Sequence, residues 1–221
     1  MTDRIKLIGN VASPYTRKMI AYLRYKRIPY EVIWGQPEEV LQKMNIEPPK
    51  PILLPVFILD RDGQATAVTD STPLIREFEE KYPDRSVLPK DPALNFINFI
   101  LEDFGDEWCT KFMFHYRWYF DEDADNAGTI LPLGINSSLK DDELAFFKEH
   151  FAKRQIDRLW VVGSNNDTAE FIDKSYKNVL SIFEEQFKKH PFLLGNFPFS
   201  CDFAVYGQFT QLVGFDPTPR R

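Results

Sequence analysis

The sequence has little cysteine, little histidine and no long apolar run. Its 221 residues include two cysteines and three histidines. Cys109 and Cys201 suggest neither a disulfide framework nor a zinc site, and they fit a reducing compartment. No apolar stretch reaches the roughly 18 residues of a membrane span, and the N-terminus has no apolar signal sequence with a cleavage site. We therefore expect a cytoplasmic protein without a membrane partner.

Basic residues are also in deficit. The chain has 27 lysine and arginine residues against 33 aspartate and glutamate residues, which gives a net charge of -6 and a pI near 5.2. The basic residues are scattered along the chain, which argues against nucleic acid as the main partner. Apolar side chains are abundant, because 43% of the residues are hydrophobic and 20 are phenylalanine. This composition is typical of a globular protein of one or two domains.

The first part of the chain, up to about Pro83, alternates short β-branched runs with helical patterns. Strands are expected at "RIKLIG", "YEVIW", "PVFIL" and "QATAVT", and helices are expected over 15–26 and 72–82. The Asp-Gly pair of "RDG" predicts a hairpin turn between the last two strands. This order predicts a small mixed sheet covered by helices.

The remainder of the chain has helical patterns only. A proline-rich linker over 84–92 is expected to join a first domain over 1–83 to an all-helical domain over 93–221. The polar segment 121–142 is expected to be a loop or a broken helix, and further helices are expected over 143–159, 167–189 and 199–213. One long helix is expected over 93–120, with a stripe on one face formed by Ile97, Leu101, Phe104, Trp108, Phe112, His115 and Tyr119.

Ser13 and Pro14 stand where the first expected strand turns into the first expected helix. Pro14 suits the first helical position, where its missing N–H costs nothing, and this makes Ser13 the N-cap. A Ser13 hydroxyl that only satisfies a backbone N–H of the first turn would be an ordinary cap. The corner also places the positive end of a helix beside Ser13, where it would stabilise an anion or a thiolate.

Two further turns of the first domain also have residues that are typical of a ligand site. Pro55 directly precedes a β-branched run, where a proline would obstruct a central strand and indicates a tight turn with a cis peptide bond after Leu54. Asp70 and Ser71 close the last expected strand and open the next helix. They provide a second helix N-terminus, suited to a carboxylate.

Three segments, in their order and spacing, resemble the N-terminal thioredoxin-like half of soluble glutathione S-transferases. They are "SPYT", "LLP" and "TDSTPLIREFEEKYP". "PFLLGNFPFSCDFAVYGQF" is similar to the family's glycine-containing turn and buried helix capped by an aspartate, with "LPKDP" in the place of the interdomain linker. One departure is Phe199, which stands where the family has Ser or Thr three residues before Asp202. The resemblance implies the glutathione transferase fold, an α/β thioredoxin-like domain followed by an all-α domain.

The resemblance also implies a glutathione site. Ser71, through its hydroxyl and backbone N–H, would hold the γ-glutamyl carboxylate, and Asp70 would face the ammonium group. Leu54, just before Pro55, would pair its backbone with the cysteinyl part. Ser13 would donate a hydrogen bond to the glutathione sulfur, which favours the thiolate and lowers the thiol pKa.

Alternatives remain for several of these roles. Tyr15 is a second hydroxyl that could face the sulfur, but Ser13 is preferred because Tyr15 lies inside the helix. Thiol-disulfide exchange is not expected, because the positions that would match a Cys-x-x-Cys pair are Ser13 and Thr16. Arg17 and Lys18, at the start of the same helix, could help to attract an acidic ligand, but exposed basic residues at such a place are usually just solvated. Cys109 and Cys201 are expected to be small buried apolar residues, and no metal site is expected.

The second ligand would be a small hydrophobic electrophile bound between the domains, against the long helix. His115 and Arg117 are candidates to line that cleft, although an aromatic stripe at helical spacing more often belongs to a core. The implied enzyme uses glutathione as cosubstrate, for conjugation to an electrophile or for peroxide reduction. The alternative is a glutathione-transferase-like protein that binds or docks a partner without catalysis. The family also implies a two-fold homodimer.

Overall fold

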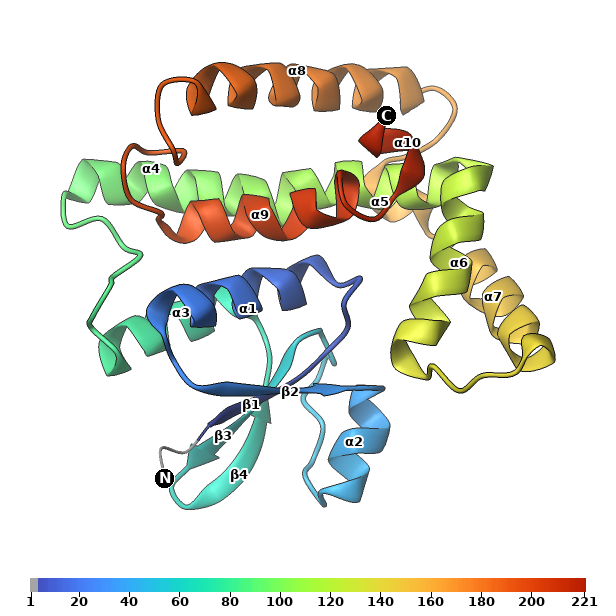
Figure 1. Ribbon diagram of the computed structural model, residues 1–221, viewed down its shortest axis with the longest axis horizontal. Coiled ribbons are helices and arrows are strands. Elements are labelled where there is room, and N and C mark those ends of the chain that lie inside the picture. The colour runs from blue at the N-terminus through green and yellow to red at the C-terminus, as the bar shows by residue number, and fades with distance from the viewer. Residues whose placement is uncertain (1–3) are drawn as a thin grey trace.

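The first part of the chain forms a four-stranded mixed sheet, shown in the computed structural model of Figure 1, which describes residues 4–221. Residues 1–3 of the predicted first domain lie outside the described residues. The strand order is β2-β1-β3-β4, with β2 parallel to β1 and β3 antiparallel to both β1 and β4. The strands are β1 (Ile5–Gly9), β2 (Tyr30–Trp34), β3 (Val56–Arg61) and β4 (Gln64–Val68). This sheet confirms the sequence prediction.

Helices cover both faces of the sheet. Neighbouring residues of β1 point to opposite faces, and both faces carry apolar side chains that must be buried. Leu7 packs in the core beneath α1 (Pro14–Lys26) and α3 (Ser71–Lys81), and Ile8 packs with Leu41 of α2 (Pro37–Lys43) on the other face. The sequence prediction missed α2, whose 7 residues are too few for a clear helical pattern.

The rest of the described chain is helical, and this all-α part completes the fold class that the sequence predicts (Figure 1). The long helix expected over 93–120 is interrupted by a π-helical segment, which re-aims the residues that follow it. The elements are α4 (Pro92–Asp103), the π-helical η1 (Phe104–Trp108), α5 (Cys109–Tyr119), α6 (Asp121–Ile135), α7 (Asp141–Ile156), the 3-10 turn η2 (Leu159–Val162), α8 (Ala169–Phe187), α9 (Ser200–Leu212) and α10 (Pro217–Arg220).

The prediction of a loop or broken helix over 121–142 is wrong, because α6 occupies most of that segment. Acidic residues at 121–123 stabilise the first turn of α6. Gly128 leaves room for α7, since a Cβ there would lie 3.1 Å from Cγ of Lys148. Packing between α6 and α7 therefore outweighs a composition that favours a loop.

The predicted apolar stripe is only partly buried. Its members Ile97 and Trp108 are 45% and 57% exposed. The buried side chains of α4 are instead the polar Asn98 and Glu102, which form hydrogen bonds to Ser200 at the start of α9. This polar contact joins α4 to α9 beside the apolar packing of Leu101 on Cys201 and Val205, and the other apolar residues of α4 face outward. The exposed side chains are Phe96, Ile97, Phe99 and Ile100.

Two glycines allow α9 to pack closely against its neighbours. A Cβ at Gly207 of α9 would lie 2.5 Å from the carbonyl oxygen of Pro14, and a Cβ at Gly105 of η1 would lie 2.8 Å from Cβ of Ala204. A larger residue at either position would push α9 away from α1 or from η1. This close packing fixes the first turn of α1, which carries the predicted site, against the helical part.

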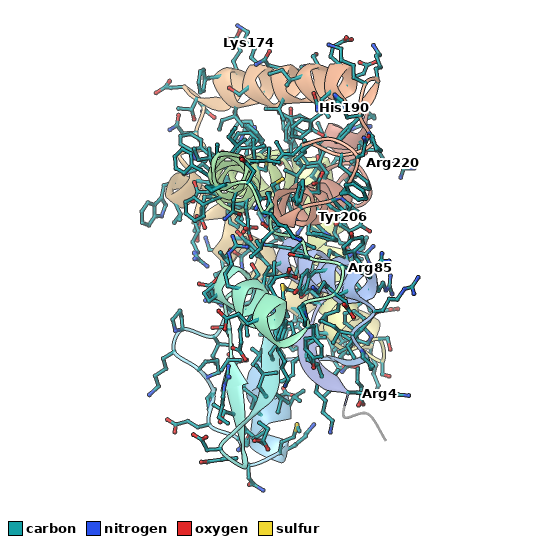
Figure 2. The ribbon with its side chains drawn as sticks, turned by 90° about the vertical axis from the view of Figure 1, so that its left-hand side faces the viewer. Arg4, Arg85, Lys174, His190, Tyr206 and Arg220 are labelled. Atoms are coloured by element: carbon teal, nitrogen blue, oxygen red, sulfur yellow. The ribbon has the colours of Figure 1, made fainter. Side chains whose placement is uncertain are left out.

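The elements are stacked in layers. The sheet lies beneath α1 and α3, and these helices lie beneath α4, α5 and α9, with α8 outermost (Figure 1). Figure 2 shows the stack from the side, with Lys174 at the helical end, Arg4 at the strand end, and Tyr206 and Arg85 between them. In the part of the chain that the structure describes, no helix has both the length and the apolar character that crossing a membrane requires.

Candidate functional site

The pairing of β1 with β3 places Pro55 beside the β1–α1 corner. Ile8 lies opposite Val56 in this antiparallel pair. One further step in the same register brings Pro55 alongside Gly9, the last residue of β1. The loop that follows Gly9 ends at Ser13, so the Ser13 corner and the Leu54–Pro55 turn lie at the same edge of the sheet.

The pairing of β3 with β4 adds the third predicted segment to this edge. Phe57 lies opposite Val68. The paired part of β4 ends at Val68, two residues before Asp70, so Asp70 follows β4 at the end of the sheet where Pro55 precedes β3. Three segments that are far apart in the sequence therefore meet at one place, which is called the corner site below: Ser13, Leu54–Pro55 and Asp70–Ser71.

Ser13 is the N-cap of α1, as the sequence predicts. Its backbone is extended, and its Oγ accepts a hydrogen bond from the backbone N–H of Thr16 at 3.2 Å. A serine hydroxyl that accepts through its oxygen still has its own proton to donate. The capping role and the donation of a hydrogen bond to a ligand are therefore compatible in this geometry.

The peptide bond between Leu54 and Pro55 is cis, which confirms the prediction. A second cis bond, between Lys50 and Pro51, was not predicted from the sequence. The pairing of β3 with β1 starts at Val56, so Leu54 precedes the paired part of the sheet. Its backbone can therefore pair with an extended peptide ligand.

Asp70 and Ser71 begin α3 in an unusual backbone conformation. Asp70 has φ 78° and ψ 113°, values that residues other than glycine rarely adopt. Its carboxylate accepts a hydrogen bond from the backbone N–H of Thr72 at 3.2 Å. Ser71 is buried, and its backbone N–H belongs to the first helical turn, which has no partner within the helix. Backbone strain of this kind is concentrated at functional sites.

Lys18 is a site residue whose burial the sequence analysis missed. The expectation of a solvated side chain is wrong, because Lys18 is 1% exposed. Its Nζ lies 3.0 Å from Oγ of Ser71, 3.1 Å from Oε1 of Glu102 and 2.5 Å from Oδ2 of Asp106. Lys18 therefore joins α1 to α3 and to the helical part. The available signal was its four-residue spacing from Pro14 and Tyr22, which places it on the buried face of α1.

The two carboxylates on Lys18 have pKa values shifted in opposite directions. Burial acts to raise the pKa of Glu102, but Lys18 and Arg76 outweigh it and hold that pKa below its usual value. Burial dominates at Asp106 and raises its pKa in spite of Lys18. Within residues 4–221, Oδ1 of Asp106 is buried without a hydrogen-bond partner. Glu102 is therefore the more firmly ionised partner of Lys18.

The hydroxyl of Tyr15 has a hydrogen-bond partner in the helical part. It donates a hydrogen bond to the backbone oxygen of Asp106 at 2.6 Å, and burial raises the pKa of Tyr15 to about 12. This contact joins α1 to η1. This contact uses the hydroxyl proton of Tyr15, and the preference for Ser13 over Tyr15 stays a prediction.

His115 lies inside the helical core and does not line a cleft as expected. Its exposed fraction is 0%. Its Nδ1 lies 2.7 Å from Oγ of Ser164, and its ring stacks on Tyr119 with 4.7 Å between the ring centroids. The aromatic stripe at this position is therefore core, which is the commoner meaning of such a pattern.

The buried His115 is expected to make folding depend on pH. Burial lowers the pKa of His115 to about 4, whereas an unfolded chain titrates near 6.5. Between these values the unfolded state binds more protons, so the free energy of unfolding should fall by about 2 kcal/mol as the pH drops from 7 to 4.5. His115→Gln, which can keep a hydrogen bond to Ser164, should lack this part of the pH dependence. Urea unfolding at both pH values measures it, and identical pH dependence in the variant would contradict the assignment.

Arg117 is also buried and supports the corner site from behind. It is 4% exposed. Its Nη1 donates to the carbonyl oxygen of Ala12 at 2.9 Å, its Nε donates to Asp216 at 2.9 Å, and its Nη2 donates to Gln211 at 2.9 Å. Arg117 therefore holds the backbone next to Ser13 and does not point into an open cleft as expected. Burial raises the pKa of Asp216 to about 6, although Arg117 acts to lower it.

Three exposed apolar side chains surround the corner site, and the sequence analysis did not identify them. Val11, Trp34 and Leu53 are 39%, 46% and 51% exposed. Val11 lies in the corner loop, Trp34 pairs with Gly9 at the end of β2, and Leu53 precedes the cis-proline turn. They form an apolar rim beside the site, whereas the positions predicted in α5 are buried.

The two cysteines are free and buried, as predicted. Burial raises the pKa of Cys109 to about 12 and also raises the pKa of Cys201. Neither thiol is therefore ionised near neutral pH. Among the described residues, histidine, cysteine, aspartate and glutamate form no group that could hold a metal ion.

The departure at Phe199 changes the cap of α9. Asp202 accepts hydrogen bonds from the backbone N–H groups of Phe199 at 2.9 Å and Leu193 at 2.8 Å. The hydroxyl of Ser200, one position later than the family's cap residue, donates to Glu102 at 2.7 Å. The aspartate part of the cap is kept, and the serine joins the buried network around Lys18 instead.

Residues 7–86 match the family model described as glutathione S-transferase, N-terminal domain. No curated protein matches the chain in sequence. Many solved structures share the fold. The beta-etherase LigF of Sphingobium sp. strain SYK-6 has a TM-score of 0.62 and 20% identity, and the alignment covers 96% of this chain and 84% of LigF. FzlA of C. crescentus has a TM-score of 0.60 and 15% identity, with 97% of this chain and 81% of FzlA covered.

A glutathione transferase of Burkholderia graminis, with two glutathione molecules bound per subunit, has a TM-score of 0.52 and 16% identity. Its alignment covers 96% of this chain and 74% of that chain. Identities this low show the shared fold alone. The family match covers residues 7–86 alone, so it shows a first part that is similar to the N-terminal domain of glutathione S-transferases, and an all-α part follows it in the structure.

Proposed function

We propose that this protein binds glutathione at the corner site and activates its thiol, for conjugation to an electrophile or for peroxide reduction. The observation that carries the proposal is the sheet register, which brings Ser13, the cis-Pro55 turn and Ser71 to one edge. Support also comes from the family match and from the glutathione-bound relative. Glutathione acts as cosubstrate, and the enzyme is a transferase.

Each part of glutathione has a group of matching chemistry in the proposed complex. The hydroxyl and backbone N–H of Ser71 hold the γ-glutamyl carboxylate at the N-terminus of α3. The exposed carboxylate of Asp70 faces the ammonium group. The backbone of Leu54 pairs with the cysteinyl residue, as in the addition of a strand to a sheet.

Ser13 activates the sulfur in this proposal. Its hydroxyl donates a hydrogen bond to the thiolate, and the N-terminus of α1 adds favourable partial charge. A fall of the thiol pKa from roughly 8.5 to near 7 raises the ionised fraction at neutral pH more than tenfold. The protein itself supplies no nucleophile.

The second substrate is a small hydrophobic electrophile that binds against the apolar rim. Val11, Trp34 and Leu53 are exposed there, and α6 adjoins the same loop, since a Cβ at Gly134 would lie 3.6 Å from Cγ2 of Val11. These side chains offer apolar contacts, which favour an uncharged ligand. The proposed place of action is the cytoplasm, where glutathione is kept reduced.

The outward apolar face of α4 supports a homodimer. Phe96, Phe99 and Ile100 are 64%, 53% and 48% exposed on one helix, and such a patch marks an interface in many proteins. We expect sedimentation velocity at micromolar concentration to show a dimer and Phe99→Glu to shift it toward the monomer. A wild-type protein that sediments only as a monomer would contradict this part of the proposal.

Calorimetric titration with reduced glutathione tests the binding site. Saturable binding is expected, and Ser71→Ala should weaken it by about tenfold or more, because a hydrogen bond to a charged group is lost. Ser181→Ala, an exposed serine of α8, is the matched control and should bind as the wild type does. Binding that is unchanged in Ser71→Ala would show that the site lies elsewhere.

A further inference from the structure

Lys18 and Ser71 form a buried contact beside the proposed carboxylate site. Nζ of Lys18 lies 3.0 Å from Oγ of Ser71, and the two residues are 1% and 8% exposed. A lysine ammonium group has only donors, so Ser71 must accept in this bond. The hydroxyl proton of Ser71 therefore points away from Lys18. Within residues 4–221, no side chain or backbone group accepts this proton, which leaves it available to a ligand.

The start of α3 has a second donor without a partner in the helix, beside the Ser71 hydroxyl. The carboxylate of Asp70 already accepts from the backbone N–H of Thr72. The backbone N–H of Ser71, at the first helical position, has no partner within the helix. Ser71 therefore offers two donors, its hydroxyl and its N–H, which together can hold one carboxylate.

The charges around Lys18 are balanced before any ligand binds. Glu102 contacts Lys18 through one oxygen and Arg76 through the other, at 3.1 Å and 2.6 Å. Asp106 is the second carboxylate on Lys18. Two cations thus face two anions, and neither carboxylate accepts the proton of Ser71, although Oδ1 of Asp106 has no hydrogen-bond partner within residues 4–221. The helix N-terminus leaves a net positive partial charge for an incoming anion.

We propose that Lys18 is a positioning residue that holds the Ser71 hydroxyl as a donor and thereby makes the site selective for a ligand that carries a carboxylate there. This inference rests on the proposed function, because it assigns the selectivity of the same site. Lys18 acts through Ser71 and does not itself contact the ligand.

The test compares two ligands, reduced glutathione and an analogue whose γ-glutamyl α-carboxylate is replaced by a carboxamide. The variant is the double substitution Lys18→Met with Asp106→Asn, which removes one buried cation and one buried anion and leaves Arg76 paired with Glu102. Asp106→Asn alone is the matched control, since it keeps Lys18 on Ser71. Circular dichroism and thermal unfolding establish that each variant is folded before the titration.

The wild type and Asp106→Asn should bind glutathione at least about tenfold more tightly than the carboxamide, and the double variant should lose most of this preference. A purely structural role of Lys18 would weaken both ligands equally and leave their ratio unchanged, which would overturn the inference. A wild type that binds neither ligand would overturn the proposed function as well, so the two failures are distinguishable.

A second measurement does not depend on the folding of a Lys18 variant. Ser71→Ala removes the hydroxyl that Lys18 is proposed to hold. Its preference for glutathione over the carboxamide should fall by about tenfold. An unchanged preference in Ser71→Ala would overturn the inference, because Lys18 would then have no hydroxyl through which to act.

Discussion

Replacing Ser13 with alanine is expected to lower kcat/KM for glutathione-dependent conjugation by about a hundredfold. The hydroxyl is the donor proposed to stabilise the thiolate, and the loss of one such donor typically costs two to three orders of magnitude. The free energy of unfolding should fall by only about 1 kcal/mol, because the Oγ of Ser13 also caps α1. Steady-state kinetics with an activated aryl halide, together with urea unfolding, measures both effects.

Two further substitutions separate the chemistry of Ser13 from its capping role. Ser13→Gly also lacks the hydroxyl but costs only a few tenths of a kcal/mol as an N-cap, so it should be nearly as stable as the wild type and as slow as Ser13→Ala. Ser13→Thr keeps a hydroxyl and should recover most of the activity. Wild-type kinetics in Ser13→Ala would show that another group, such as the hydroxyl of Tyr15, faces the sulfur.

Arg117→Leu is expected to cause the largest loss of stability, about 3–4 kcal/mol, which urea unfolding at pH 7 measures. The substitution leaves the buried carboxylate of Asp216 without its cation and removes the donors to Gln211 and to the carbonyl oxygen of Ala12. The loss should shrink below pH 6, because burial already raises the pKa of Asp216 to about 6 in the native protein and a protonated carboxyl no longer needs a cation.

Control variants distinguish the buried ion pair from ordinary surface charge. Arg61→Leu removes a cation that is 43% exposed and paired with Glu77, and it should cost less than about 1 kcal/mol. The double substitution Arg117→Leu with Asp216→Leu removes both buried charges and should recover much of the stability. An Arg117→Leu variant as stable as Arg61→Leu would contradict the assigned role.

The features that could be predicted from the sequence are those with local causes. Ser13 before Pro14 is a helix start by its own chemistry, and the N-cap bond to Thr16 confirms it. Pro55 before a β-branched run predicts the cis turn that the structure contains. Strand patterns alternate within a few residues, so the positions of the four strands along the chain could be predicted as well.

The features that could not be predicted depend on partners far away in the sequence. Lys18 is buried because Glu102 and Asp106 arrive from the helical part, and Arg117 turns inward because Asp216 and Ala12 lie beside it. The side chains of the long helix that contact the site are thus polar and buried. The aromatic stripe of the predicted long helix indicated His115 as a cleft residue instead, and His115 is part of the core.

The helical part was harder to predict because its helices also depend on contacts with residues that are distant in the sequence. Segment 121–142 has the composition of a loop, yet α6 forms because its small residues pack against α7. In α4 the exposed face is apolar and the buried face is polar, the reverse of the usual pattern. Which face of such a helix is buried depends on the neighbouring helix, and the periodicity of one sequence does not contain that information.

Ultraviolet absorbance of bound glutathione as a function of pH tests the central claim most directly. The thiolate absorbs and the thiol does not, so the titration of the saturated complex gives the pKa of the bound sulfur. We expect a pKa near 7, more than one unit below the roughly 8.5 of a free thiol, and a return toward the free value in Ser13→Ala. A bound thiol with an unshifted pKa, or no saturable binding, would contradict thiol activation and favour a glutathione-transferase-like scaffold that serves binding alone.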